Sequence, residues 1–120
     1  MNLTELLENL ETALAALHSW DKVLYTATQN EQEIELALKL EKNRLILLHC
    51  GSAEATKNFG ANEDIRTAKM AELLAPFSES VTIQKRHRLE TEQGQKIATT
   101  IYQHQRDLLR LAELSAATMK

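Results

Sequence analysis

Residues 3–17 read LTELLENLETALAAL, and their leucines recur at alternating steps of four and three residues. Two later segments, residues 34–48 and 97–111, repeat the spacing. The positions that follow it are Leu3, Leu7, Leu10, Leu14, Leu17, Ile34, Leu38, Leu45, Leu48, Ile97, Ile101, Leu108 and Leu111. The spacing places these side chains on one stripe of a helix, and it is typical of coiled coils and helical bundles. We therefore interpret these residues as a packing or oligomerisation seam.

Composition supports long helices in one domain that spans residues 1–120. Hydrophobic residues make up 43% of the chain but aromatic residues only 4%. The core must therefore consist mainly of leucine, isoleucine and alanine, which suits helices that share narrow seams.

Glycine and proline punctuate only the middle of the chain. None occurs before Gly51, after which Gly60 and Pro76 follow closely and Gly94 stands alone. We expect helices at about 3–17, 20–50, 63–74 and 79–116, because helix breakers separate long helical segments. The sequence leaves open whether the first two are continuous. It also leaves open whether Gly94 marks a kink, a close helix approach or a break.

The ends of these segments carry local signals. Asn2 and Asn62 are predicted helix caps, and Gly51 is predicted to end a helix in the left-handed conformation. Residues 52–60 are predicted to form a polar loop, and Pro76 to stop the short helix that precedes it.

The predicted fold is therefore all-α: a long antiparallel helical hairpin or coiled-coil bundle with a short N-terminal helix and a short crossover helix. If the chain turns at the middle of the 51–76 connector, the numbers of facing residues add up to about 130. Ile34 then lies near residues 95–97, and Glu41, which interrupts the stripe of residues 34–48, lies near Arg88. His104 interrupts the stripe of residues 97–111 and is expected to set the register.

Charge is divided unequally along a chain whose net charge is −3. Residues 1–35 hold seven acidic side chains against one lysine, whereas residues 81–120 hold seven basic side chains against four acidic ones. Opposite signs at the two ends favour an antiparallel arrangement. The lone Cys50, the lack of a signal-peptide pattern and the short apolar runs predict a soluble cytoplasmic protein with no membrane contact.

No catalytic, cofactor-binding or metal-binding constellation is visible, so we expect no enzyme and no cofactor. The histidines His18, His49, His87 and His104 are spread widely, without a second ligand at helical spacing. Cys50 stands at a predicted helix C-terminus, which disfavours a thiolate.

The residues Lys85, Arg86, Arg88, Arg106 and Arg110 form a basic patch on the last predicted helix. Phosphate contacts need such charges, so nucleic-acid binding is the competing hypothesis. Against it, Glu90 and Glu92 are close in sequence and no aromatic residues interleave to stack on bases.

The connector Lys57–Lys69, read KNFGANEDIRTAK, resembles a turn in small all-helical bacteriophage and prophage proteins. The general plan is similar to that of phage recombination-mediator proteins. The resemblance implies an oligomeric helical hairpin and a role in loading a recombinase on single-stranded DNA. From the residues themselves we expect a non-enzymatic structural or adaptor protein that forms a homo-oligomer or binds a protein partner through coiled-coil packing.

Overall fold

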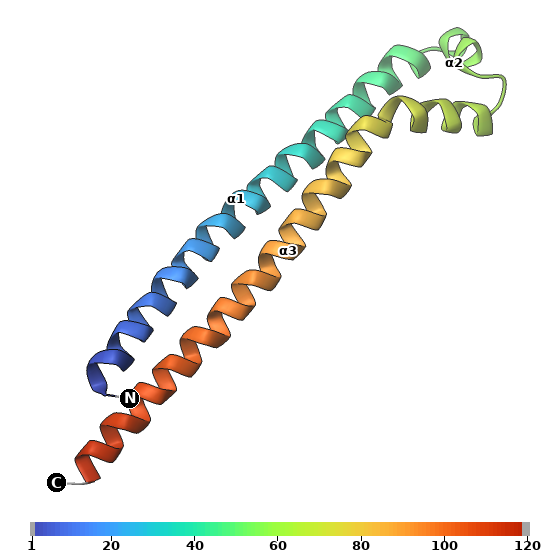
Figure 1. Ribbon diagram of the computed structural model, residues 1–120. Coiled ribbons are helices and arrows are strands. Elements are labelled where there is room, and N and C mark those ends of the chain that lie inside the picture. Colours follow the sequence, from blue (N-terminus) through green and yellow to red (C-terminus); the bar gives the residue numbers. More distant parts are fainter. Residues whose placement is uncertain (1, 119–120) are drawn as a thin grey trace. The chain divides into compact units, whose positions relative to one another are not determined.

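The computed structural model describes residues 2–118, which form three α-helices and no strand. They are α1 (Leu3–Cys50), α2 (Ala53–Phe59) and α3 (Glu63–Thr118), labelled in Figure 1. The prediction of an all-α helical hairpin is confirmed.

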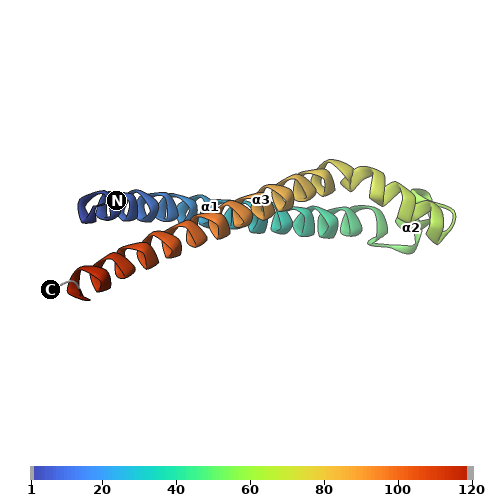
Figure 2. The same ribbon diagram turned by 60° about the horizontal axis from the view of Figure 1, so that its bottom comes forward.

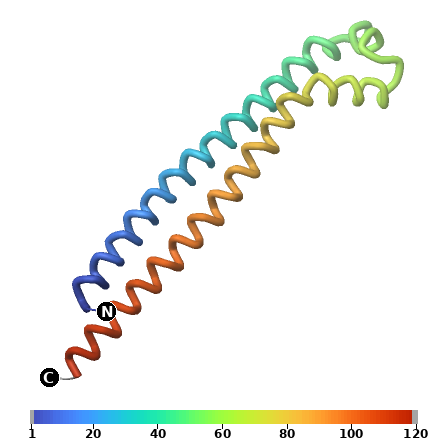
Figure 3. The backbone as a smooth tube through the Cα atoms, in the orientation of Figure 1, coloured from blue at the N-terminus to red at the C-terminus, as the bar shows by residue number. Residues whose placement is uncertain are grey.

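The chain divides into two compact units. Unit 1 contains the described parts of Met1–Ala27 and Arg88–Lys120, and unit 2 is Thr28–His87. Each unit pairs a segment of α1 with an antiparallel segment of α3, and unit 2 also holds α2 and the turns beside it. Figure 3 traces the chain through α2 from the end of α1 to the start of α3. The expectation of one domain over residues 1–120 stays a prediction.

Polar side chains fix the start of each helix. The side-chain oxygens of Asn2, Ser52 and Asn62 each accept a hydrogen bond from the backbone N–H three residues further on, at 2.8, 3.1 and 2.9 Å. Such caps satisfy N–H groups that have no partner inside the helix. The predicted caps at Asn2 and Asn62 are confirmed.

Three local predictions about the connector and the N-terminal half were incomplete or wrong. Residues 3–50 form one helix, so the continuous alternative is the one observed. The predicted polar loop at residues 52–60 contains α2, because Ser52 supplies a helix cap. Gly51 does not adopt a left-handed conformation, since no glycine among the described residues has a positive φ.

Pro76 lies inside α3, so the predicted end of a helix at residue 74 and new start at residue 79 are wrong. Proline in a helix interior costs about 3 kcal/mol, because it lacks an N–H and its ring clashes with the preceding turn. Tertiary packing offsets this cost here. Pro76 and Phe77 line a small hollow with Ile34 and Ala37 of α1, and Leu74 is buried one turn earlier. The helix bends in the yellow part of Figure 1, as proline predicts.

The antiparallel register differs from the predicted one. In unit 1 Trp20 faces Gly94, and in unit 2 Ile34 faces Ser80, so the numbers of facing residues add up to about 114 rather than 130. The turn is centred between the end of α1 and the start of α3, because Pro76 does not contribute to it. Ile34 therefore lies beside residues 76–80 and not beside residues 95–97.

Gly94 permits a close approach of α3 to α1 within unit 1. A Cβ atom placed on Gly94 would lie 2.7 Å from Cζ2 of the Trp20 indole, well inside van der Waals contact. The close-approach alternative is thus confirmed, and α3 continues through Gly94 without a break. Ala13 and Ala98 are buried beside it, so small residues line this stretch of the pair.

We predict that Gly94→Ala destabilises the protein by about 1 kcal/mol. The new methyl group displaces the Trp20 indole, and the strain of about 1–3 kcal/mol exceeds the gain of about 1 kcal/mol in helix propensity. In a Trp20→Ala background the clash is absent, so the same change should stabilise by up to about 1 kcal/mol. Urea unfolding of the four proteins measures both effects, and a stabilising Gly94→Ala in the native background would contradict the close packing.

Candidate interaction surface

The seam between α1 and α3 in unit 1 is built mainly from small and polar side chains on the α3 side. Its buried and half-buried residues are Leu6, Leu10, Ala13, Leu17, Leu24 and Ala27 of α1 and Thr91, Gln95, Ala98, Tyr102, Gln105, Leu109 and Ala112 of α3. Both sets follow alternating steps of three and four residues, apart from the place of the more exposed Trp20. Gln95 also donates a hydrogen bond to Asp21 at 3.2 Å.

The seam of unit 2 has the same spacing but includes charged side chains. Its buried and half-buried residues are Glu31, Ile34, Leu38, Glu41 and Leu45 of α1 and Leu74, Phe77, Val81 and Gln84 of α3. Glu31 is only 7% exposed. Three of the nine seam residues are therefore polar, namely Glu31, Glu41 and Gln84.

The structure places the predicted stripe residues at different depths. Leu45 is buried, and those that are half-buried are Leu10, Leu14, Leu17, Ile34, Leu38 and Leu108. Those that are exposed are Leu3, Leu7, Leu48, Ile97, Ile101 and Leu111, together with His104. On α3 the seam of unit 1 runs through Ala98, Tyr102 and Leu109, one residue beyond each of three predicted positions.

Three exposed apolar side chains of α3, Ile97, Ile101 and Leu111, belong to a continuous face of unit 1, which we call the outer face. It consists of Gly94, Ile97, Ile101, His104, Leu108 and Leu111 of α3 and Asn9, Thr12, Ala16, Ser19 and Val23 of α1. Its members flank the seam on one side, as their helical positions require. No aspartate, glutamate, lysine or arginine belongs to this face.

Two hollows lie along the outer face. One of about 170 Å³ is lined by Ala13, Ala16, Trp20, Gly94, Ile97, Ala98 and Ile101. The other, of about 370 Å³, continues toward the start of α1 and is lined by Asn9, Thr12, Ala13, Ala16, Ile101 and Gln105. Small side chains on α1 create both hollows beside the larger side chains of α3.

The last turns of α3 have no α1 segment opposite them. With facing numbers that add up to about 114, residues beyond about 111 extend past Leu3, the first residue of α1. Figure 2 shows these turns leaving the start of α1. Leu111 and Leu114 are accordingly 63% and 57% exposed.

Sequence reasoning missed a second exposed ridge, which lies in unit 2. Leu36, Leu40 and Leu47 of α1 point away from the seam, and Leu47 is 76% exposed. Their steps of four and seven residues are a helical signal in their own right. The neighbouring stripe through Ile34, with its stronger match to the 4-3 spacing, concealed that signal.

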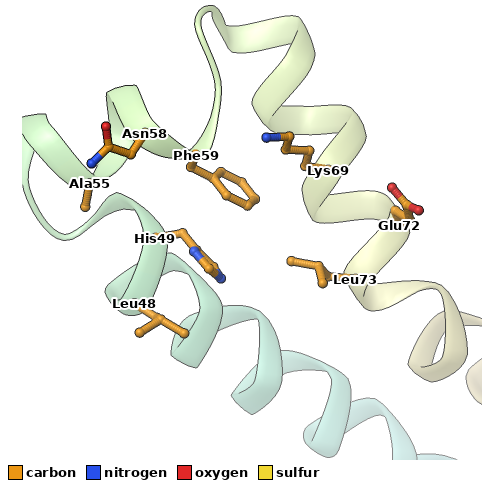
Figure 4. Close-up of a pocket in the computed structure, with 8 residues that line it drawn as sticks. All are labelled: Leu48, His49, Ala55, Asn58, Phe59, Lys69, Glu72 and Leu73. Atoms are coloured by element: carbon orange, nitrogen blue, oxygen red, sulfur yellow. The ribbon is translucent and has the colours of Figure 1, made fainter.

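Around α2, Phe59 anchors the turn and borders a hollow of about 690 Å³ (Figure 4). Its ring stacks on His49 with the centroids 4.5 Å apart, and Nζ of Lys69 lies 5.6 Å from the centroid of the same ring. Figure 4 shows Glu72 and Leu73 of α3 on the same border. These contacts hold α2 against both long helices of unit 2.

A second hollow of about 460 Å³ borders Phe59 and is lined by Lys42, Cys50, Phe59, Glu63, Arg66, Thr67, Met70, Ala71 and Leu74. Within residues 2–118, no group of three or more histidine, cysteine, aspartate or glutamate side chains is placed to hold a metal ion. None of the described helices has an apolar stretch long enough to cross a bilayer.

The charges that the sequence analysis paired find partners within their own helices. Nη2 of Arg44 lies 2.6 Å from Oε1 of Glu41, and Nη1 of Arg88 lies 2.6 Å from Oε1 of Glu92. The expected Glu41–Arg88 pair was wrong because the register was wrong. Hydrogen bonding from Arg44, with its charge, lowers the pKa of the Glu41 carboxyl below its usual value.

The predicted basic patch is divided between the two units. Lys85 and Arg86 are exposed on the unit 2 part of α3, whereas Arg88, Arg106 and Arg110 lie on the unit 1 part. Arg88 is half-buried, and Arg106 and Arg110 are exposed. The last two flank the seam on the side away from the outer face.

Comparisons with protein-family models, curated proteins and solved structures find no significant match to this chain.

We predict that Arg44→Gln raises the pKa of Glu41 toward its ordinary value, because the charged hydrogen-bond donor is removed. Because the pKa of Glu41 is lowered in the folded state, the ion pair stabilises the fold at pH values above the ordinary carboxyl pKa. That contribution is lost as the pH falls through the lowered value. Carboxyl NMR titration measures the change, with Arg86→Gln as the control. An unmoved Glu41 titration in Arg44→Gln would contradict the pairing.

Proposed function

We propose that this protein is a non-enzymatic structural or adaptor protein that acts through coiled-coil helix packing and self-association. The observation that carries the proposal is the outer face of unit 1, which has no Asp, Glu, Lys or Arg and where Ile97 and Ile101 are about half exposed, while the α3 side of the seam consists mainly of small and polar residues. Large exposed apolar faces on helices mark interaction sites. The resemblance of residues 57–69 supports a phage or prophage origin.

Burial energies support association through this face. Full burial of a leucine or isoleucine side chain stabilises by about 1.5–3 kcal/mol. Covering the exposed halves of Ile97, Ile101, Leu111 and Leu114 therefore gains on the order of 4 kcal/mol for each copy. Two copies gain about twice that, which is comparable to the cost of about 4–15 kcal/mol for lost translational and rotational freedom. Burial of the other residues of the outer face adds to this free energy.

We predict that Ile101→Asp abolishes self-association and leaves the helical fold intact. Ile101 is 49% exposed, so an aspartate is tolerated in the single chain, but an unpaired charge buried in an interface is costly. The dissociation constant should rise at least about tenfold. Light-scattering mass over a range of concentrations measures it, and circular dichroism checks the helix content.

The matched control is Gln103→Asp, which adds the same charge to an exposed residue on the side of α3 away from the outer face. Its mass should equal that of the wild type. A wild-type protein that stays monomeric at high concentration would remove the basis for the proposal.

We infer single-stranded nucleic-acid binding as a second candidate function, supported by Arg106 and Arg110. Both are exposed, and their i, i+4 spacing places them together on a side of α3 that the outer face does not use. Lys96 and Gln103 lie on the same side of α3, nearer its start, and Lys96 adds a third positive charge. Phosphate contacts along such a strip give a binding constant that falls with salt concentration.

This candidate predicts binding of single-stranded DNA at low salt that weakens as salt is added. The double variant Arg106→Gln, Arg110→Gln should reduce the slope of the salt dependence by roughly 1.4, because about 0.7 is lost for each of the two phosphate contacts removed. The control pair Lys39→Gln, Lys42→Gln removes two charges from α1 and should leave the slope unchanged. Fluorescence anisotropy measures the binding, and its absence at low salt eliminates the candidate.

A further inference from the structure

The outer face of unit 1 has a hollow end and a bulky end. At the level of α3 residues 94–101 the small residues Ala13, Ala16, Gly94 and Ala98 leave a hollow beside Ile97 and Ile101. At the other end the half-buried Leu108 is followed by two exposed side chains, Leu111 of the outer face and Leu114 of the bordering row. His104 stands midway between the two ends. A face with this asymmetry matches an inverted copy of itself.

We propose that the partner of the outer face is a second copy of this chain, held in an antiparallel dimer whose two-fold axis passes beside His104. The inference rests on the proposed self-association and adds the identity and register of the contact. A two-fold interface uses the same surface on both copies, so each element must find its complement in the other copy.

The two-fold axis at His104 places the bulky leucines of one copy over the hollow of the other copy. Residue 108 of one copy comes to the level of residue 100 in the other, and residue 111 to the level of residue 97. Leu108 and Leu111 then cover the hollow of about 170 Å³ that has Ala13 and Ala16 on its α1 side. Leu114 reaches the level of Gly94, beside the partly exposed Trp20. The same contacts occur twice, once on each side of the axis.

The charges agree with this register. The outer face has no formally charged member, so apposing two copies buries no Asp, Glu, Lys or Arg. The row of α3 that borders the interface consists of residues seven apart. Its members are Gln93, Thr100, Asp107 and Leu114, and Asp107 is the one formal charge among them. The two-fold axis brings it to the level of Ile101 of the second copy, where no like charge opposes it.

The area is sufficient for a stable dimer. Residues 94–114 of α3 span roughly 30 Å along the helix, and two helices side by side are roughly 20 Å wide. The flat footprint is therefore on the order of 600 Å², and the relief of the side chains brings it near the approximately 800 Å² per partner of stable interfaces.

Disulfide trapping tests the register. In a Cys50→Ser background the only thiol is the introduced one, because Cys50 is the single cysteine of the chain. Antiparallel helices 8–10 Å apart bring two Cα atoms on the axis within the 4.4–6.8 Å that a disulfide spans. His104→Cys should therefore give a covalent dimer on mild oxidation. Gln103→Cys, an exposed neighbour outside the face, should not.

The outcomes separate this inference from the proposed function. A dimeric mass with trapping at residue 104 and not at residue 103 supports the two-fold axis. A dimeric mass with no trapping at residue 104, or with equal trapping at both positions, overturns the axis and leaves self-association standing. A monomeric mass overturns both.

A second variant tests the hollow without a disulfide. Ala16→Phe fills the space that Leu108 and Leu111 of the other copy would occupy, and its exposed position lets the single chain keep its fold. We expect the dissociation constant to rise at least about tenfold in sedimentation equilibrium. His18→Phe, at an exposed position about 200° around α1 from Ala16 and outside the outer face, is the control. An unchanged constant in Ala16→Phe overturns the proposal.

Discussion

The close approach of α1 and α3 in unit 1 constrains everything else on that part of the molecule. Trp20 lies directly over Gly94, and Ala13 and Ala98 are buried beside them, so at this level α3 contributes only small side chains to the seam. Helices that meet through small residues bury little apolar surface. Ile97, Ile101 and Leu111 of α3 remain outside the pair, on a face without Asp, Glu, Lys or Arg. The apolar face that these side chains form is a consequence of how the two helices pack in unit 1.

The sequence predicted the helical hairpin because two of its signals are strong and local. Asn2 and Asn62 cap helices as expected, and the 4-3 spacing places Leu38 and Leu45 in the seam of unit 2. Pro76 misled the prediction because its local cost is offset by tertiary packing that a sequence window does not contain. The resulting error in the position of the turn shifted the register and created the false Glu41–Arg88 pair.

The interaction surface was predictable as a set of residues but not as a surface. The spacing found Ile97, Ile101, Leu108 and Leu111, yet it gave no means to tell whether α1 or another chain covers them. The seam of α3 runs one residue away, through Ala98, Tyr102 and Leu109, where alanine and tyrosine carry a weaker signal. Two overlapping stripes on one helix differ by about 100° in direction, and only the identity of the facing helix decides between them.

The distribution of aromatic side chains gives the molecule an optical asymmetry. Its single tryptophan and both tyrosines, Trp20, Tyr25 and Tyr102, belong to unit 1, whereas Phe59 and Phe77 belong to unit 2. Indole emission and near-ultraviolet dichroism therefore monitor the Trp20–Gly94 contact and its surroundings. These signals report almost nothing of the turn around α2, so unfolding of that turn has to be followed by backbone probes.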